Sequence, residues 1–199
     1  MTITALKEQI KTPDRINIFV DGKYSFSLTF SEVIDYKVRM GNELDEVALE
    51  VLKKASTDGK IRMRAYEWLL NRPHSTRELK DYLRRKKTEA DFVEKLVNEF
   101  TDRGTLSDER FAEWFTERAV RKNKSARMVQ NELRGKGVQS AVMEGVDDKA
   151  SLAALVIKLA SRPRYAVDQA RLIRYLQGKG FSYGDIKEAL SLQQPEQDV

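Results

Sequence analysis

The chain has 199 residues, 41% of them hydrophobic and 34% charged, so it can form one or two ordinary domains but not a large multidomain enzyme. It has no cysteine, which excludes disulfides, thiol catalysis, iron–sulfur clusters and cysteine-ligated zinc. The single histidine, His74, is expected to be an ordinary surface residue. No apolar run reaches the ~18 residues of a membrane span. The N-terminus lacks the apolar core of a signal peptide, so we expect a soluble, cytoplasmic protein with no membrane partner.

Positive charge is concentrated in the second part of the chain. The sequence carries 36 Lys+Arg against 31 Asp+Glu, a formal net charge of +5. Residues 1–60 hold 9 basic and 10 acidic residues, whereas residues 61–199 hold 27 and 21. The side-chain pattern also changes here, from strand-like alternation to helical periodicity. We therefore predict a turn at residues 57–60 and a domain boundary after residue 60.

Residues 1–60 are expected to form a β-hairpin and a helix. Apolar and polar residues alternate on both sides of Asp21 and Gly22, which suit the type I′ turn of a two-residue hairpin. A third strand is predicted at residues 3–11 and a helix at residues 44–55. A hairpin alone would be marginal, so its apolar face should pack on this helix. The residues expected at that contact are Val47, Leu49, Val51 and Leu52.

The remainder contains three related segments that recur at intervals of about 45 residues. Each carries an apolar pair at positions i and i+4, followed by a basic helix end, and further helical patterns lie before and after it. The pairs are Leu79 and Leu83, Val129 and Leu133, and Leu172 and Leu176. Nine helices are therefore predicted, three in each repeat. No repeat can bury its apolar stripe alone, so the repeats should stack on one another.

The predicted fold is mainly α: an elongated curved array of three tandem three-helix repeats, preceded by a small β-hairpin or sheet plus helix. The N-terminal module occupies residues 1–60. The repeats occupy residues 61–104, 105–147 and 148–192, and a flexible tail follows at residues 193–199.

Local signals mark several helix ends. Ser75 and Glu78 form a capping box that opens the second helix of the first repeat. Ser107 is expected to cap the first helix of the second repeat. Gly137 and Gly180 lie where a glycine after a helix is favoured.

Acidic and aromatic residues in the repeats have structural interpretations. Asp147 and Asp148 precede a helical pattern, where acids interact favourably with the helix dipole, and we prefer this to a cation site. Trp68 and Trp114 occupy corresponding first helices, so we favour core positions for them over a role as base-stacking platforms. The third helix of the second repeat is predicted at residues 142–146.

The sequence offers little chemistry for an enzyme. No glycine-rich run followed by Lys and Ser or Thr is present, so a Walker-type phosphate loop is absent. The Gly-Lys-Gly runs at 135–137 and 178–180 are too short and are interpreted as helix ends. We therefore predict a protein that is not an enzyme, with no catalytic, cofactor-binding or metal-binding residues and no cofactor.

Several segments in their order resemble the RecX family of recombinase regulators. Residues 79–87 (LKDYLRRKK) are similar to its first repeat, and residues 104–112 (GTLSDERFA) to the entry into its second. Residues 132–138 (ELRGKGV) and 178–181 (GKGF) are similar to the second-repeat ending and to the third repeat. The hairpin at 21–27 (DGKYSFS) fits the N-terminal extension of some members. Two residues depart from the pattern, because Lys87 and Ser125 stand where glycine is usual.

The resemblance implies a non-enzymatic regulator of homologous recombination and DNA repair, linked to the SOS response. Such a protein binds the recombinase RecA and lies in the groove of the RecA filament on single-stranded DNA. It would inhibit the recombinase, ATPase and coprotease activities of RecA. Single- and double-stranded DNA, bound through phosphates, are further expected partners, and we expect a monomer.

The candidate residues for filament or DNA contact are cations at or near the repeated helix ends: Arg84, Arg85, Lys86, Lys87, Arg121, Lys122, Lys124, Arg127, Arg134, Lys136, Arg171, Arg174 and Lys179. If the repeats stack in similar orientations, these cations form a ladder that contacts phosphates, so binding would be sequence-independent and salt-sensitive. A merely solvated face is the alternative. A second hypothesis is a DNA-binding protein or transcription regulator with a helix-turn-helix-like pair.

Overall fold

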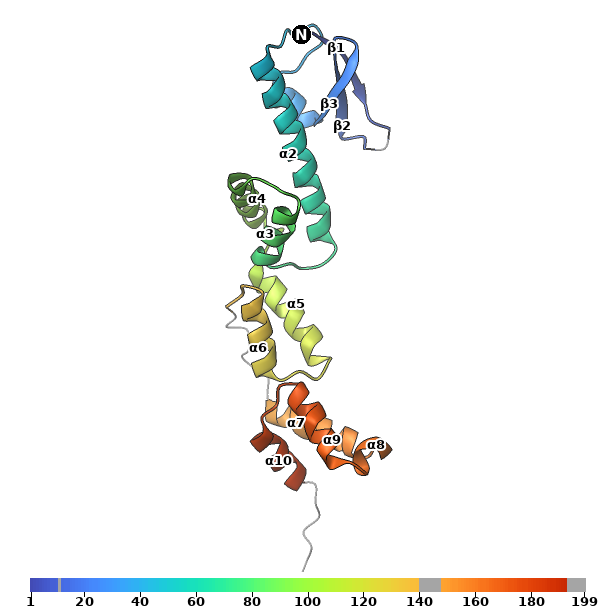
Figure 1. The fold of residues 1–199 in the computed structure, drawn as a ribbon, viewed down its shortest axis with the longest axis vertical. Coiled ribbons are helices and arrows are strands. Elements are labelled where there is room, and N and C mark those ends of the chain that lie inside the picture. Colours follow the sequence, from blue (N-terminus) through green and yellow to red (C-terminus); the bar gives the residue numbers. More distant parts are fainter. Residues whose placement is uncertain (11, 140–147, 193–199) are drawn as a thin grey trace, which may run out of the picture. The chain divides into compact units, whose positions relative to one another are not determined.

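The computed structural model describes residues 1–10, 12–139 and 148–192. Two compact units divide the chain. The first comprises Met1–Arg72 and Lys80–Thr105, and the second comprises Pro73–Leu79 and the chain from Leu106 onward. Ten helices and one three-stranded sheet occur within the described residues (Figure 1). The prediction of a mainly α fold with a small N-terminal sheet is therefore confirmed.

The sheet of the first unit is antiparallel, with strand order β1-β2-β3. Its strands are Ile3–Glu8 (β1), Arg15–Val20 (β2) and Lys23–Thr29 (β3). The predicted hairpin is confirmed, because Asp21 and Gly22 both have positive φ angles, of 48° and 79°. The third strand is confirmed as β1.

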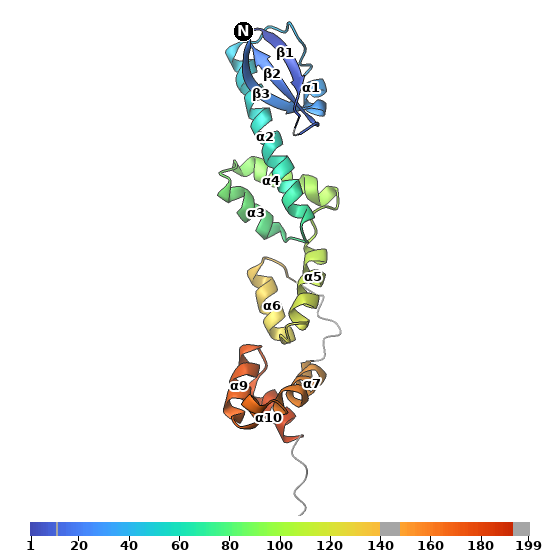
Figure 2. The same ribbon diagram turned by 90° about the vertical axis from the view of Figure 1, so that its right-hand side faces the viewer.

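A short helix that the sequence did not predict follows the sheet. Phe30–Asp35 (α1) begins where Thr29 accepts a hydrogen bond from the Glu32 N–H, while the Glu32 carboxylate accepts one from the Thr29 N–H. The strand ends at Thr29, where this capping box starts the helix, and the Phe30 side chain is exposed. Figure 2 shows α1 beside the sheet.

The turn predicted at residues 57–60 is wrong, because these residues lie inside the 25-residue helix Glu46–Leu70 (α2). The predicted boundary after residue 60 therefore falls within a continuous helix. Gly59 is buried there, and a Cβ at this position would lie 2.5 Å from Glu32 Oε1. The glycine thus allows α1 to approach α2, and it does not form a turn.

The N-terminal half of α2 covers the sheet, as Figure 1 shows. Leu52 is buried against the sheet and Leu49 packs at the edge of the same cluster, as predicted. Val47 and Val51 were expected there as well, but they are 73% and 49% exposed. They lie on the opposite face because residues in contact on a helix recur at intervals of three or four.

The C-terminal half of α2 packs with two further helices, Thr76–Arg85 (α3) and Ala90–Asp102 (α4). The residues of α3 from Lys80 onward belong to the first unit. The buried face of α4 carries Phe92, Leu96 and Phe100. Trp68 is half-buried, so it is neither a fully enclosed core residue nor a fully exposed platform.

The second unit continues with six helices in its described part. They are Asp108–Val120 (α5), Ala126–Gly135 (α6), Asp148–Ala160 (α7), Pro163–Ala166 (α8), Gln169–Gly178 (α9) and Tyr183–Ser191 (α10). The short α8 was not predicted. The third helix predicted at residues 142–146, Asp147 and the predicted tail at 193–199 lie outside the described residues.

The apolar pairs that define the repeats are buried as predicted. Leu79 and Leu83, Val129 and Leu133, and Leu172 and Leu176 are each at most 1% exposed. In the second unit, the second pair belongs to a cluster formed by α5 and α6. The third pair belongs to a cluster formed by α7, α9 and α10. Trp114 packs at the edge of the α5–α6 cluster and is half-buried.

Candidate functional site

The four cations at the end of α3 are exposed and differ in their contacts. Arg84 donates to Asp81 at 3.3 Å, and Lys86 Nζ lies 5.7 Å from the centroid of the Tyr82 ring. Arg85 and Lys87 form no ion pair within the part of the chain that the structure describes. Two full charges at this helix end are therefore unneutralised by neighbouring carboxylates.

Lys87 has a left-handed backbone, with φ +57°. An L-residue in this region costs free energy that glycine does not. The departure from glycine at this position is therefore a conformational cost, and the exposed lysine side chain forms no hydrogen bond or ion pair within the described residues that would offset it.

The cations at the end of α6 divide in the same way. Lys136 Nζ lies 2.9 Å from Glu78 Oε1, and this ion pair forms within the second unit. Arg134 is exposed and forms no ion pair among the described residues. The Lys136 charge is thus partly neutralised by Glu78, whereas the Arg134 charge can contact a partner.

The α9 segment presents Arg171, Arg174 and Lys179. Arg171 is exposed, and Arg174 lies 3.9 Å from Asp168, which is a weak exposed pair. Lys179 Nζ lies 5.3 Å from the Tyr175 centroid, much as Lys86 lies over Tyr82. A tyrosine four residues before a lysine thus recurs at the ends of α3 and α9.

Two candidates at the start of α6 and in the loop before it form internal contacts. Lys124 forms an ion pair with Glu132 at 2.5 Å, and both side chains are largely shielded from solvent. Arg127 donates to the backbone carbonyl of Gly180 at 3.1 Å. Arg121 pairs with Glu117 on the surface, and Lys122 is exposed without an ion pair among the described residues.

Sequence reasoning missed a repeated junction in the second unit. The N–H of Thr76, at the start of α3, donates to the Asp108 carboxylate at 2.7 Å. The N–H of Ala126, at the start of α6, donates to the Asp148 carboxylate at the same distance. Each acid also lies in the first turn of its own helix, the role that the sequence predicted for Asp148. Both in addition cap the N-terminus of a different helix.

Serine and glycine complete both junctions. Ser75 Oγ donates to the Lys136 carbonyl at 2.9 Å, and the Ser125 N–H donates to the Lys179 carbonyl at 2.9 Å. The glycine after each carbonyl has a positive φ, +79° at Gly137 and +96° at Gly180, as predicted for residues that follow a helix. The absence of a side chain at each glycine allows the serine-led helix start to approach.

Ser107 and Ser75 cap their helices, which confirms the predicted Ser107 cap and the serine half of the predicted capping box. Ser107 accepts from the Arg110 N–H and Ser75 from the Glu78 N–H. The Glu78 carboxylate also contacts His74 Nδ1, at 3.1 Å. His74 is only 5% exposed, so the prediction of a surface histidine is wrong. The ring is buried because it packs under the start of α3 and contacts this acid.

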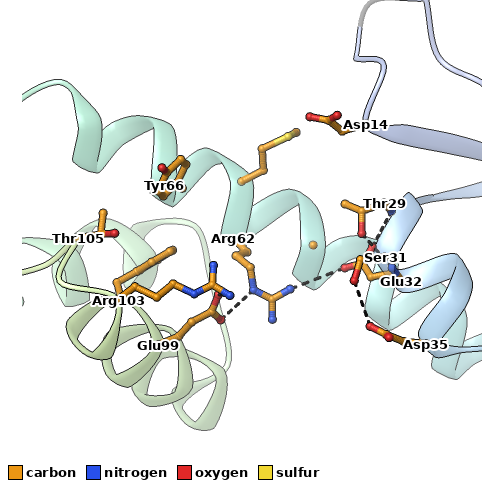
Figure 3. Close-up of a pocket in the computed structure, with 13 residues that line it drawn as sticks. Asp14, Thr29, Ser31, Glu32, Asp35, Arg62, Tyr66, Glu99, Arg103 and Thr105 are labelled. Atoms are coloured by element: carbon orange, nitrogen blue, oxygen red, sulfur yellow. Dashed lines mark hydrogen bonds and ion pairs between the residues drawn. The ribbon is translucent and has the colours of Figure 1, made fainter.

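A charged groove of about 830 Å³ lies in the first unit (Figure 3). Arg62 lies 3.0 Å from Glu99 and 3.7 Å from Glu32, and Glu99 also pairs with Arg103 at 3.3 Å. These pairs join α1, α2 and α4 within the unit. At the start of β2, burial lowers the pKa of Arg15, while the nearby Glu32 charge opposes that shift.

Comparison with known proteins identifies the family. Three family models match the chain: the N-terminal domain of regulatory protein RecX at residues 1–45, the second RecX three-helix domain at 107–146 and the third at 148–190. A regulatory protein RecX from Listeria monocytogenes serotype 4b (strain CLIP80459) is 30% identical over the whole chain and 78% of its own length. The chain belongs to the RecX family. A RecX protein from Bacillus subtilis (strain 168) is 27% identical over 98% of the chain and 78% of its own length.

Solved RecX structures share the fold. A crystal structure of regulatory protein RecX aligns with a TM-score of 0.72 at 23% identity, covering 94% of this chain and 98% of that one. RecX from Lactobacillus salivarius aligns with a TM-score of 0.57 at 22% identity, covering 68% and 95%. No helix in the described ranges is long and apolar enough to cross a membrane. RecX proteins are named as regulators, and the resemblance seen in the sequence is confirmed.

Proposed function

We propose that this chain is a non-enzymatic regulator that binds RecA and occupies the groove of the RecA filament on single-stranded DNA. The observation that carries the proposal is the match to the RecX family, which extends from the N-terminal hairpin to α10. Occupation of the groove would obstruct incoming duplex DNA and the repressor whose self-cleavage the filament promotes. Strand exchange, ATP turnover and coprotease activity of RecA would then fall.

The exposed cations at helix ends support a contact with a polyanionic or acidic partner. Among the candidates, those with no ion pair, cation–π contact or side-chain hydrogen bond in the described part of the chain are Arg85, Lys87, Lys122, Arg134 and Arg171. Lys86 and Lys179 lie over tyrosine rings; Lys86 is exposed and Lys179 is half-buried. Such groups contact phosphates or carboxylates without reading a base sequence, so binding should weaken as salt rises.

Other candidates are assigned a smaller role. Lys124 and Arg127 are held by Glu132 and by the Gly180 carbonyl, and Lys136 is held by Glu78. Breaking these contacts would weaken packing as well as remove charge. The surface that we propose for the filament therefore consists mainly of the unpaired cations, and the paired ones position helices.

The test is a charge-reversal variant of the α3 end, Arg85→Glu with Lys87→Glu. Binding to RecA filaments assembled on single-stranded DNA is measured by co-sedimentation or anisotropy at several salt concentrations. We expect at least a tenfold loss of affinity and a shallower salt dependence, by about one unit of log–log slope for each lost phosphate contact.

A matched control reverses two exposed lysines of the N-terminal module, Lys23→Glu and Lys37→Glu. It makes the same change in net charge, and Lys37 shares the left-handed backbone of Lys87. Its affinity should stay within about twofold of the wild type. Equal losses in the two variants would show that net charge alone drives binding, and unchanged binding in both would remove the role of the α3 end.

A further inference from the structure

A small basic pocket lies in the first unit between α2 and α3. It has a volume of about 230 Å³ and is lined by Thr57, Ile61, Arg64, Tyr82 and Lys86. The lining contains two cations and no carboxylate. Arg64 and Lys86 are exposed, and neither forms an ion pair within the described residues. The pocket therefore offers two positive charges to a ligand at no cost of breaking an internal pair.

One wall of the pocket is an aromatic ring held in a fixed orientation. Tyr82 stacks on Trp68 with ring centroids 4.7 Å apart and planes only 9° from parallel. Trp68 lies about one turn beyond Arg64 on α2, and Arg64 lines the pocket whereas Trp68 does not. The Tyr82 ring thus stands between Trp68 and the pocket. Stacking fixes the plane of this ring before any ligand arrives.

We propose that this pocket receives one unstacked base of a single-stranded nucleic acid. Lys86 Nζ lies over the Tyr82 ring, 5.7 Å from its centroid, so the base would displace this exposed head group and stack on Tyr82 in its place. Arg64 and the displaced Lys86 would then contact the phosphates on either side. Aromatic stacking beside a cationic track is the usual way in which proteins bind single strands without sequence preference. An acidic peptide would satisfy the two cations but would make no use of the flat aromatic wall. The volume of about 230 Å³ can hold one planar ring system.

This inference goes beyond the proposed function, in which the helix ends contact phosphates only. It concerns binding of bare single strands and does not depend on RecA. The chain also provides a comparison pair. Tyr183 and Lys187 on α10 have the same i,i+4 spacing, with Lys187 Nζ 5.4 Å from the Tyr183 centroid. Both come from a single helix, whereas the pocket is built by two.

The test measures anisotropy of labelled oligonucleotides without RecA. A thymidine oligomer and an abasic oligomer of the same length carry the same phosphates, but only the first can stack. We expect the wild type to bind the thymidine oligomer at least tenfold more tightly. Tyr82→Leu should reduce that preference about tenfold, since one stacked base contributes roughly 1–3 kcal/mol, and should leave abasic binding unchanged. Tyr82→Phe keeps the ring and should keep the preference.

Tyr183→Leu is the control and should leave both affinities unchanged. Trp114→Phe leaves Trp68 as the only tryptophan, so its emission should change with the thymidine oligomer and not with the abasic one. Equal binding of the two oligomers by the wild type would overturn the proposal. A competition experiment adds poly-glutamate at matched charge to the complex with the thymidine oligomer. Displacement of the oligomer from the wild type but not from Tyr82→Leu would also overturn the proposal, because the pocket would then be an acidic-peptide site. Filament binding is measured separately, so either result leaves the proposed function standing.

Discussion

Replacement of Gly180 by alanine should destabilise the second unit strongly. The residue has φ +96°, a conformation that costs an L-residue about 1–2 kcal/mol. The added Cβ would lie 2.6 Å from Met128 Cβ and would also collide with Ser125 Oγ. Relief of that collision would stretch the 2.9 Å hydrogen bond from the Ser125 N–H to the Lys179 carbonyl, which contributes about 1 kcal/mol. We therefore expect a loss of about 2–3 kcal/mol in the free energy of unfolding.

Urea unfolding followed by circular dichroism measures this loss. The matched control is Gly178→Ala, two residues earlier, where a Cβ would meet nothing within 4 Å and the residue is helical. Alanine is the better helix former, so this variant should be neutral or up to about 1 kcal/mol more stable. If the two variants unfold at the same urea concentration, Gly180 does not serve as a point of close approach and our account of the junction is refuted.

Three further predictions concern stability. Lys87→Gly should raise the free energy of unfolding by about 1 kcal/mol, because glycine adopts the positive φ without strain, and calorimetry measures this gain. The same change should lower filament affinity, which co-sedimentation measures. Asp148→Ala should cost about 1 kcal/mol in urea unfolding, since the Ala126 N–H loses its acceptor, and an unchanged midpoint would contradict the cap. Burial raises the pKa of Asp58, so ionisation of this acid disfavours the folded state as pH rises through that pKa. Asp58→Asn should therefore stabilise the chain at pH 7 and lose that advantage below about pH 4, as thermal unfolding across pH would report.

The sequence predicted features that depend on local rules. The apolar pairs Val129 with Leu133 and Leu172 with Leu176 are buried as their i,i+4 spacing requires. Asp21 and Gly22 form the hairpin, because few residues adopt two successive positive φ angles. These signals are contained in a few neighbouring residues, so no knowledge of tertiary contacts is needed to interpret them.

Features that depend on a distant partner were missed or misinterpreted. Gly59 suggested a turn, but the position needs glycine because a Cβ there would collide with the carboxylate of Glu32, which is remote in sequence. The caps that Asp108 and Asp148 provide to other helices were not predicted, because nothing local indicates them. His74 was placed on the surface because it follows Pro73 in a predicted loop, whereas its burial arises from tertiary packing.

The sequence identified the candidate cations by residue type and position, but only the structure shows which of them form internal ion pairs. The sequence placed Lys122 and Lys124 together near one loop, yet Lys124 is paired with Glu132 and Lys122 is exposed. Ion pairs between positions eight residues apart, as in Lys124 and Glu132, have no simple helical spacing. A charge count therefore overstates how many cations can meet a partner.

Electron microscopy of RecA filaments on single-stranded DNA, with and without this chain, tests the central claim most directly. The account predicts continuous added density that follows the helical groove, and loss of that density with Arg85→Glu and Lys87→Glu. Filaments with an empty groove, at concentrations where the chain binds bare DNA, would contradict it.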